Sequence, residues 1–290
     1  MSYVAHHTSG SLSITFNAQF FKTVRDRILN MRLVRVLRHS IPTYGELCED
    51  PDGITQIKFF EGNPIAGSAS HTGEMQPLDS CKLLAPVVPS KIIGIGDNFL
   101  SPDEKLEPFS TPLAFLKPSS AACGPDDLIV RPKSADSLAF EGELAVIMKD
   151  TDGKISESEV DEAIFGYTIA NDVSAQPWQK LDAQWFRAKG ANTFCPLGPW
   201  INTDLSVQDA SNLNLETRLS GKLVQSSNTA YLKRTIPEII SFLSEAFSFV
   251  AGDAVLMGTP VGAGPMQDGD SIEIRIEHLG TLKNTTGCSL

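Results

Sequence analysis

The sequence predicts a mainly β fold with a few helices (α+β), divided into a small N-terminal β-rich domain and a larger β-dominated domain. Three observations predict it. Short apolar runs alternate with turn residues along most of the chain, only two stretches carry clear helix signals, and strands do not alternate with helices as in a doubly wound sheet. The 290 residues suffice for one large domain with a smaller one beside it.

The first ninety residues divide into an extension and a small domain. Residues 1–30 hold three basic residues, one acid and several Ser and Thr. This composition is compatible with a mitochondrial transit peptide, although a poorly ordered extension is the favoured interpretation. Residues 31–90 contain strand-like runs (MRLVRVL, ITQIKFF) and turn residues such as Asp52-Gly53, which predict β-hairpins, and they close with the proline-containing linker LLAPVVPS.

Residues 91–285 form the predicted larger domain. Its helices are expected at 156–164, where Ser156 is a plausible N-cap, and at 235–249, where Pro237 suits a first turn. Its strands are expected in the segments KIIGIG, DDLIVRP, GELAVIM, FGYTIANDV, LNLETRLS, DAVLMG and SIEIRIE.

Charge, hydropathy and cysteine usage narrow the function classes. The net charge of −11 argues against a nucleic-acid partner, because binding phosphates requires a basic face. No apolar run reaches the roughly 18 residues of a membrane helix, so no membrane partner is expected. The five cysteines are odd in number and lack a CxxC pair, which predicts free thiols in a reducing compartment, cytoplasmic in the simplest case.

The stretch LAFEGELAVIM (138–148) places two acids in an apparently buried strand. Side chains alternate faces along a strand, so Glu141 and Glu143 share one side, and the flanking residues make both sides apolar. An isolated E-x-E is usually a solvated strand face, whereas two buried carboxylates at this spacing would repel by about 2–3 kcal/mol. A third acid, Asp172, ends the next strong strand. Three oxygen ligands suit Mg²⁺, Mn²⁺ or Ca²⁺, and the spacing alone leaves the metal and solvated interpretations equally open.

Seven ordered segments carry a resemblance to a known family. They resemble the fumarylacetoacetate hydrolase family, specifically its acylpyruvate hydrolase and oxaloacetate decarboxylase-like branch, over residues 31–285. The resemblance implies a catalytic domain of rolled mixed β-structure, a homodimer and a bound Mg²⁺ or similar ion (Mn²⁺ or Ca²⁺). The family's metal ligands match Glu141, Glu143 and Asp172. The segments are KIIGIGDNF, PLAFLKPSSA, FEGELAVIM, GYTIANDVSA, FCPLGPWI, GDAVLMGTPVGAG and LGTLKN.

Three further positions match the family's substrate contacts. Lys189 matches a lysine near the metal, where its ammonium could hold an enolate or carboxylate. Gln179 matches a polar contact, and Thr259 matches a threonine that presents its hydroxyl and N–H to the substrate's carboxylate. Without the resemblance, Lys189 would more simply be a surface lysine.

The family pattern is broken after the strand that ends in GIG. The family continues with NYxxHxxE, whose histidine and glutamate activate water, but this chain reads NFLSPDEK, with Pro102 in the histidine's place and Lys105 in the glutamate's. No histidine occurs between residues 72 and 277. Asp103 and Glu104 are therefore candidates for a weaker base, and Phe99 is a candidate pocket residue.

These observations predict a metal-dependent enzyme that acts on a small 2-oxo or 1,3-dioxo acid. Decarboxylation or tautomerisation of a metal-chelated enolate needs mainly an electron sink, whereas C–C bond hydrolysis needs a base for water, so the former is favoured. Two alternatives stay open: a metal-binding but catalytically silent protein, and a specialised biosynthetic-pathway enzyme with a larger substrate.

Overall fold

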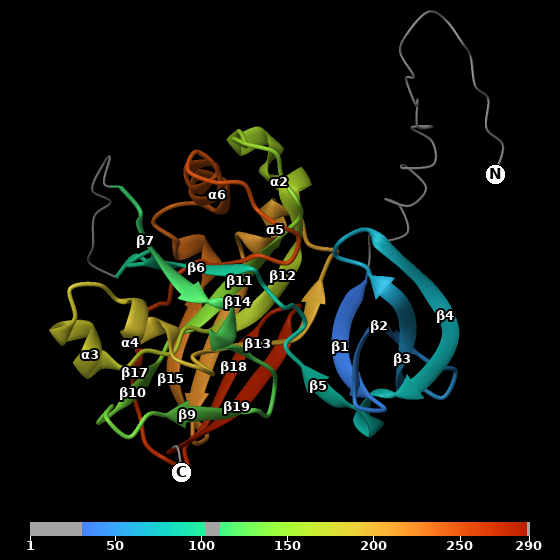
Figure 1. The fold of residues 1–290 in the computed structure, drawn as a ribbon, viewed down its shortest axis with the longest axis horizontal. Helices are drawn as coiled ribbons and strands as arrows, with labels where there is room; N and C mark the ends of the chain where they lie inside the picture. Colours follow the sequence, from blue (N-terminus) through green and yellow to red (C-terminus); the bar gives the residue numbers. More distant parts are fainter. Residues whose placement is uncertain (1–30, 102–110, 289–290) are drawn as a thin grey trace, which may run out of the picture.

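The protein was analysed as a computed structural model that describes residues 31–101 and 111–288 (Figure 1). These residues form long strands and a few short helices, which confirms the predicted mainly β class. Among the described residues, no helix is both long and apolar enough to cross a membrane.

The N-terminal strands form a meander that joins the main sheet. The first four strands pair in sequence order, antiparallel throughout, as expected for hairpins. β1 also pairs with β13 (Cys195–Asn202), so the meander extends the large sheet on the right of Figure 1. The elements are β1 (Arg32–Arg38), β2 (Ile41–Glu49), β3 (Thr55–Asn63), β4 (Ser68–Pro77), η1 (Leu78–Ser80) and β5 (Lys82–Leu84).

The large sheet has twelve strands, in the order β4-β3-β2-β1-β13-β12-β11-β16-β6-β7, with β5 on β1 and β8 on β13. Its centre pairs β11 antiparallel with both β12 and β16. The strands not yet introduced are β6 (Lys91–Gly96), β7 (Leu113–Pro118), β8 (Ala122–Cys123), β11 (Gly142–Met148), β12 (Ile164–Asn171) and β16 (Ala254–Leu256).

A second sheet of five strands, ordered β15-β14-β18-β19-β9, packs near the first, and β10 pairs with β17 in a small third sheet. The predicted continuous strand 138–148 is therefore wrong at Glu141, because β10 turns away to pair with β17 while β11 stays in the large sheet. The strands are β9 (Leu128–Arg131), β10 (Leu138–Phe140), β14 (Asn214–Leu219), β15 (Lys222–Asn228), β17 (Gly264–Met266), β18 (Ser271–Ile276) and β19 (Gly280–Cys288).

The helices are short and lie at the edges of the sheets (Figure 1). Ser156 caps its helix through a reciprocal bond pattern with Glu159, and Pro237 lies in the first turn of α6, both as predicted. The helix expected at 235–249 ends at Ser244, beyond which the chain turns to bury Phe249. The helical segments are η2 (Ser119–Ala121), η3 (Glu157–Glu159), α2 (Val160–Ala163), α3 (Gln176–Leu181), α4 (Phe186–Gly190), α5 (Val207–Ala210), η4 (Thr229–Tyr231) and α6 (Ile236–Ser244).

Both faces of β11 are covered. Leu144, Val146 and Met148 belong to a core cluster shared with the five-stranded sheet and α6, and Ala145 and Ile147 belong to a second cluster. Every residue of β11 is buried, including Glu143. Glu143 therefore lies in the interior and not on a solvated strand face, and Glu141, directly before β11, is half-buried.

Candidate metal centre

Three carboxylates meet where β11 begins and β12 ends. Glu141 is the residue between β10 and β11, Glu143 is the second residue of β11, and Asp172 directly follows β12. The antiparallel pairing of these strands sets Gly142 opposite Asn171, and the Asp172 N–H donates to the Glu141 carbonyl at 2.9 Å. One oxygen from each carboxylate lies within 4.8 Å of those of the other two.

This arrangement fits a hard divalent cation. Two oxygens on opposite sides of one cation are separated by about twice a metal–oxygen distance, roughly 4–5 Å for Mg²⁺, Mn²⁺ or Ca²⁺. All three donors are carboxylates, the ligand type that these ions prefer over the thiolates and imidazoles of zinc sites. The structure thus brings together the three residues that the sequence singled out as metal ligands.

Burial makes the cluster costly without a counter-charge. Glu143 is 2% exposed and Asp172 1% exposed, whereas Glu141 is half-buried. Burial raises the pKa of Glu143 well above its usual value, and the neighbouring Asp172 and Glu141 raise it further. Burial also raises the pKa of Glu141, against the opposing effect of Lys189. A nearby cation would favour the ionised form of both glutamates.

Two buried lysines hold Asp172, one on each oxygen. Lys189 donates from Nζ to Asp172 Oδ2 at 2.7 Å and to Glu141 Oε2 at 2.8 Å. Lys117, on β7, donates to Asp172 Oδ1 and to the Val173 carbonyl. Burial disfavours the charged form of Asp172, but the two lysines outweigh this and hold the pKa of Asp172 below its usual value.

Lys189 carries its charge at the carboxylates. Burial alone would lower the pKa of Lys189, but Asp172 and Glu141 outweigh burial and raise it, so the side chain is an ammonium at neutral pH. Its Nζ also lies 5.1 Å from the centre of the Phe115 ring. An ammonium held here can stabilise negative charge that develops on a ligand at the cluster.

Hydrogen-bond donors fix the two glutamates. The Gly258 N–H donates to Glu143 Oε2 at 2.6 Å, and the Ser174 hydroxyl donates to Glu141 Oε1 at 3.0 Å. Gly258 has a φ of +97°, and a Cβ there would lie 2.9 Å from Asn98 Cβ. A glycine is therefore needed for this N–H to reach the carboxylate.

The remaining predicted site residues differ in how they relate to the three carboxylates. Thr259 donates its hydroxyl to the Gly142 carbonyl at 2.9 Å, between the two glutamates. Gln179 lies half-buried on α3, and its side chain has no hydrogen bond to the carboxylates among the described residues. Phe99 is buried and forms a bridge with Leu232. The predicted bases Asp103 and Glu104, together with Pro102, lie outside the described residues.

Sequence reasoning missed two buried polar residues of this region, Lys117 and Gln225. Each is the one residue of its type in an otherwise ordinary strand segment, LAFLKP and KLVQSSN. A lysine directly before a proline in an apolar strand was the available signal for Lys117. Gln225 gave none, because a single glutamine in a strand is usually on the solvated face.

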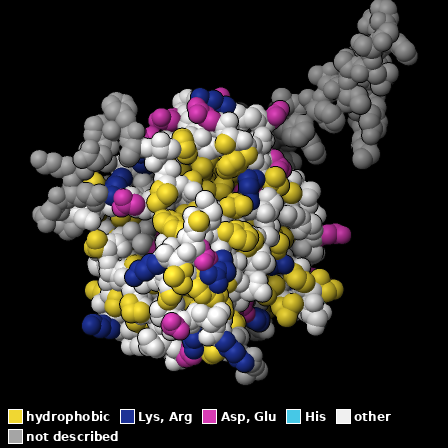
Figure 2. Space-filling view, turned by 60° about the vertical axis from the view of Figure 1, so that its left-hand side comes forward, with side chains coloured by type: hydrophobic (Ala, Val, Ile, Leu, Met, Phe, Trp, Pro, Cys, Tyr) yellow, Lys and Arg dark blue, Asp and Glu magenta, His cyan; other side chains and the backbone are white. Residues whose placement is uncertain are grey.

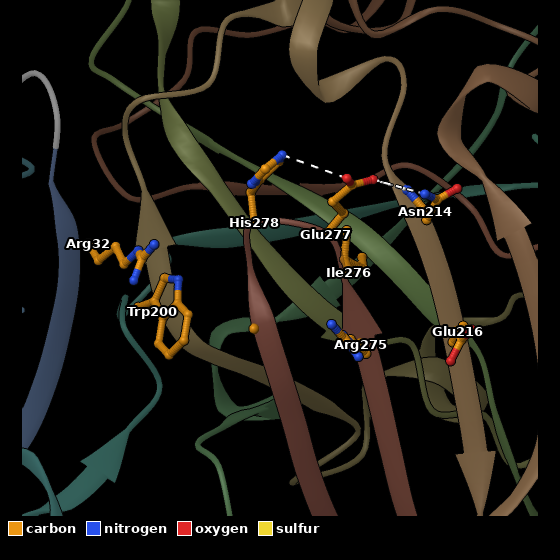
Figure 3. Close-up of a pocket in the computed structure, with 9 residues that line it drawn as sticks. Arg32, Trp200, Asn214, Glu216, Arg275, Ile276, Glu277 and His278 are labelled. Carbon is orange, nitrogen blue, oxygen red and sulfur yellow. Dashed lines mark hydrogen bonds and ion pairs between the residues drawn. The ribbon is translucent and has the colours of Figure 1, made fainter. Parts of the chain in front are cut away.

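The described residues also line a cavity of about 570 Å³ that contains none of the cluster residues (Figure 3). Arg275 and Glu216 lie on strands of the five-stranded sheet, Arg32 faces Trp200, and Glu277 pairs with His278 at 3.8 Å. Both acidic and basic side chains line the cavity, so it has no clear preference for the charge of a ligand.

Comparison with known families agrees with the geometry. The family model described as "Fumarylacetoacetate (FAA) hydrolase C-terminal" matches residues 91–286, which is more than half of the chain. The chain belongs to the fumarylacetoacetate hydrolase family. All three carboxylates and both lysines of the cluster fall within the matched residues.

Relatives within the fumarylacetoacetate hydrolase family cover most of the chain. Protein Rv2993c of Mycobacterium tuberculosis is 40% identical over 83% of this chain and 90% of its own length. Oxaloacetate tautomerase YisK of Bacillus subtilis is 37% identical over 73% of this chain and 75% of its own length.

Solved structures of the family have the same fold. 5-Carboxymethyl-2-hydroxymuconate delta-isomerase from Mycobacterium smegmatis is 38% identical with a TM-score of 0.82, covering 89% of this chain and 100% of its own. Maleylpyruvate hydrolase from Sphingobium sp. SYK-6, solved with manganese(II) and pyruvate, is 26% identical with a TM-score of 0.73, covering 90% and 100% of the two chains. The names of YisK and of these two solved structures describe a tautomerase, an isomerase and a hydrolase, respectively.

Proposed function

We propose that this chain binds a divalent cation (Mg²⁺, or Mn²⁺ or Ca²⁺) through Glu141, Glu143 and Asp172, and catalyses tautomerisation or decarboxylation of a small 2-oxo or 1,3-dioxo acid. The observation that carries the proposal is the ammonium of Lys189, which contacts two of the three carboxylates in a site to which no imidazole of the described residues belongs. The manganese-bound maleylpyruvate hydrolase and the tautomerase YisK support the cation and the substrate class.

The charge of the site favours an anionic ligand. With the three carboxylates and the two lysines all charged, the cluster carries one net negative charge. A divalent cation would turn this into one net positive charge inside a buried environment, where electrostatic attraction is strong. A 2-oxo acid supplies a carboxylate and a carbonyl oxygen that match this charge.

The chemistry divides between the cation and the chain. When bound, the cation would act as a Lewis acid that polarises the 2-oxo group. Lys189 stabilises the negative charge that forms when a proton or a carboxylate leaves the carbon next to that group. Asp103 and Glu104 stay our candidates for the proton acceptor, and Gln179, Phe99 and the Thr259 N–H for substrate contacts.

Hydrolysis ranks second because water activation needs a base. The described histidines lie away from the cluster: His71 stacks on Phe60 in the N-terminal meander, His278 lines the separate cavity, and His39 is in the β1–β2 turn. A reaction through an enolate requires mainly that the negative charge of the enolate be stabilised, and the Lys189 ammonium can do this without an imidazole.

The test follows the enol form of oxaloacetate by its ultraviolet absorbance, with Mn²⁺ present, and pyruvate release in parallel. We expect faster loss of the enol form with the wild type, and a roughly 10²–10³-fold lower rate with Lys189→Met, as for removal of one charge-stabilising donor. Lys180→Met, on the exposed side of α3, is the matched control. No acceleration of tautomerisation or decarboxylation by the wild type would sink the proposal; pyruvate release from an acylpyruvate alone would point to hydrolysis.

Three further expectations stay proposals. We propose a homodimer, supported by exposed apolar side chains on the neighbouring elements β7, α3 and α4, namely Leu113, Leu116, Leu181 and Phe186; hydrophobic side chains also gather on the face shown in Figure 2. Light scattering in solution would test it. The division of the chain into 1–30, 31–90 and 91–285, and a cytoplasmic rather than mitochondrial location, are likewise proposed.

A further inference from the structure

A closed ring of hydrogen bonds includes Gly142, the residue between Glu141 and Glu143. The Gly142 N–H donates to Gln225 Oε1 at 3.2 Å, and Gln225 Nε2 donates to Thr259 Oγ1 at 2.8 Å. The Thr259 hydroxyl in turn donates to the Gly142 carbonyl at 2.9 Å. Both polar groups of Gly142 are therefore held, and Gly142 connects Glu141 to Glu143.

The orientation of the Gln225 amide is determined by its partners. Its Nε2 also donates to the Pro260 carbonyl at 2.8 Å, and a carbonyl can only accept. Turning the amide over would set its NH₂ against the Gly142 N–H and its oxygen against the Pro260 oxygen. The observed orientation is the one in which all three contacts are hydrogen bonds.

Gln225 connects two sheets at the site. It lies on β15 of the five-stranded sheet, whereas Gly142 begins β11 of the large sheet, 83 positions away in sequence. The residue is 1% exposed, so its amide was fully removed from water on folding. A buried amide that lost its partners would be left unsatisfied at a cost in free energy, which favours a permanently formed ring.

The close approach of Thr217 and Gln225 explains the glycine between the two glutamates. A Cβ on Gly142 would lie 2.5 Å from Thr217 Oγ1 and 3.1 Å from Gln225 Oε1. The φ of Gly142 is not in the left-handed region, so the requirement is one of space and not of backbone conformation. The sequence E-G-E thus combines two carboxylates with room for the Thr217 hydroxyl and the Gln225 amide.

We propose that Gln225 is a positioning residue for the cation site. Its amide holds the Gly142 N–H directly and the Gly142 carbonyl by way of the Thr259 hydroxyl, and thereby orients the two glutamates. Because the Thr259 hydroxyl already donates its proton within the protein, Thr259 offers a ligand its backbone N–H. The inference rests on the proposed function only in requiring that Glu141 and Glu143 bind a cation. It does not depend on which reaction follows.

The experiment measures Mn²⁺ affinity by isothermal titration calorimetry for the wild type and Gln225→Leu, each shown to be folded by circular dichroism. Asn284→Leu is the matched control, because Asn284 is also a buried amide, donates to two backbone carbonyls (Gly124 and Asp127) and lies in the same sheet. We expect Gln225→Leu to weaken Mn²⁺ binding about tenfold, or about 1.4 kcal/mol, and Asn284→Leu to change it less than twofold.

Equal Mn²⁺ affinity in the two variants would overturn the proposal, since a merely structural residue lowers the melting temperature without moving the affinity of the folded protein. If Gln225→Leu does not fold, the same titration is made with Thr259→Val, which removes the other side-chain member of the ring. A lower Mn²⁺ affinity of Thr259→Val then supports the proposal, and an unchanged affinity overturns it. A wild type that binds Mn²⁺ but turns over no oxo acid removes the proposed reaction alone, whereas a wild type that binds no Mn²⁺ removes both.

Discussion

The buried ion pair between Lys117 and Asp172 makes a quantitative prediction for the variant Lys117→Met. Both side chains are essentially unexposed, so removing the ammonium leaves a buried carboxylate without one of its two counter-charges. Breaking a buried ion pair from one side costs about 3–5 kcal/mol. Because Lys189 still donates to Asp172 at 2.7 Å, we expect the lower end, about 3 kcal/mol.

The assay is urea denaturation of metal-free protein followed by tryptophan fluorescence. A loss of about 3 kcal/mol corresponds to a midpoint about 1 M lower for a denaturant slope near 3 kcal/mol per molar. Lys154→Met is the control, because Lys154 pairs with Glu245 on the surface with both side chains more than half exposed, and it should cost below about 1 kcal/mol. Equal midpoints for the two variants would refute the assignment of Lys117 as the buried counter-charge of Asp172.

Two further predictions concern the carboxylates. The pKa of Glu143 is raised and a cation needs the ionised form, so Mn²⁺ affinity should begin to fall on acidification above the pH at which an ordinary glutamate titrates. The stability of the metal-free protein should fall as the pH rises through that raised pKa, because the folded state binds the proton more tightly than the unfolded state. A Mn²⁺ affinity that stays unchanged down to pH 5 would contradict this prediction. Gly142→Ala should lower stability by about 1–3 kcal/mol, because its Cβ would meet Thr217 Oγ1 at 2.5 Å. An unchanged melting temperature would contradict the tight packing around Gly142.

The sequence singled out the three carboxylates that the structure brings together, because their pattern is local. Two acids inside an apolar run, and a third acid after the next strong strand, can be recognised without knowing which strands pair. The break at Glu141 could not be recognised in this way, because it depends on pairing between β10 and β17, more than a hundred residues apart. The helix that begins at Ile236 was placed correctly by its Pro237 signal, but its end depends on the burial of Phe249.

The buried polar residues show the same limit. Lys117 is buried because Asp172, 55 positions away, balances its charge, and Gln225 is buried because Gly142 and Thr259 use its amide. A single sequence shows such residues only as polar positions in a strand. The partners that make their burial favourable are supplied by the tertiary fold.

Mn²⁺ titration of the wild type beside Glu143→Gln tests the cation site most directly. Glutamine keeps the size of the side chain and its contact with the Gly258 N–H, but removes the charge from the most deeply buried glutamate of the cluster. We predict one Mn²⁺ per wild-type chain and at least tenfold weaker binding by Glu143→Gln. Equal binding by both proteins, or none by the wild type, would contradict the assignment of Glu141, Glu143 and Asp172 as a metal centre.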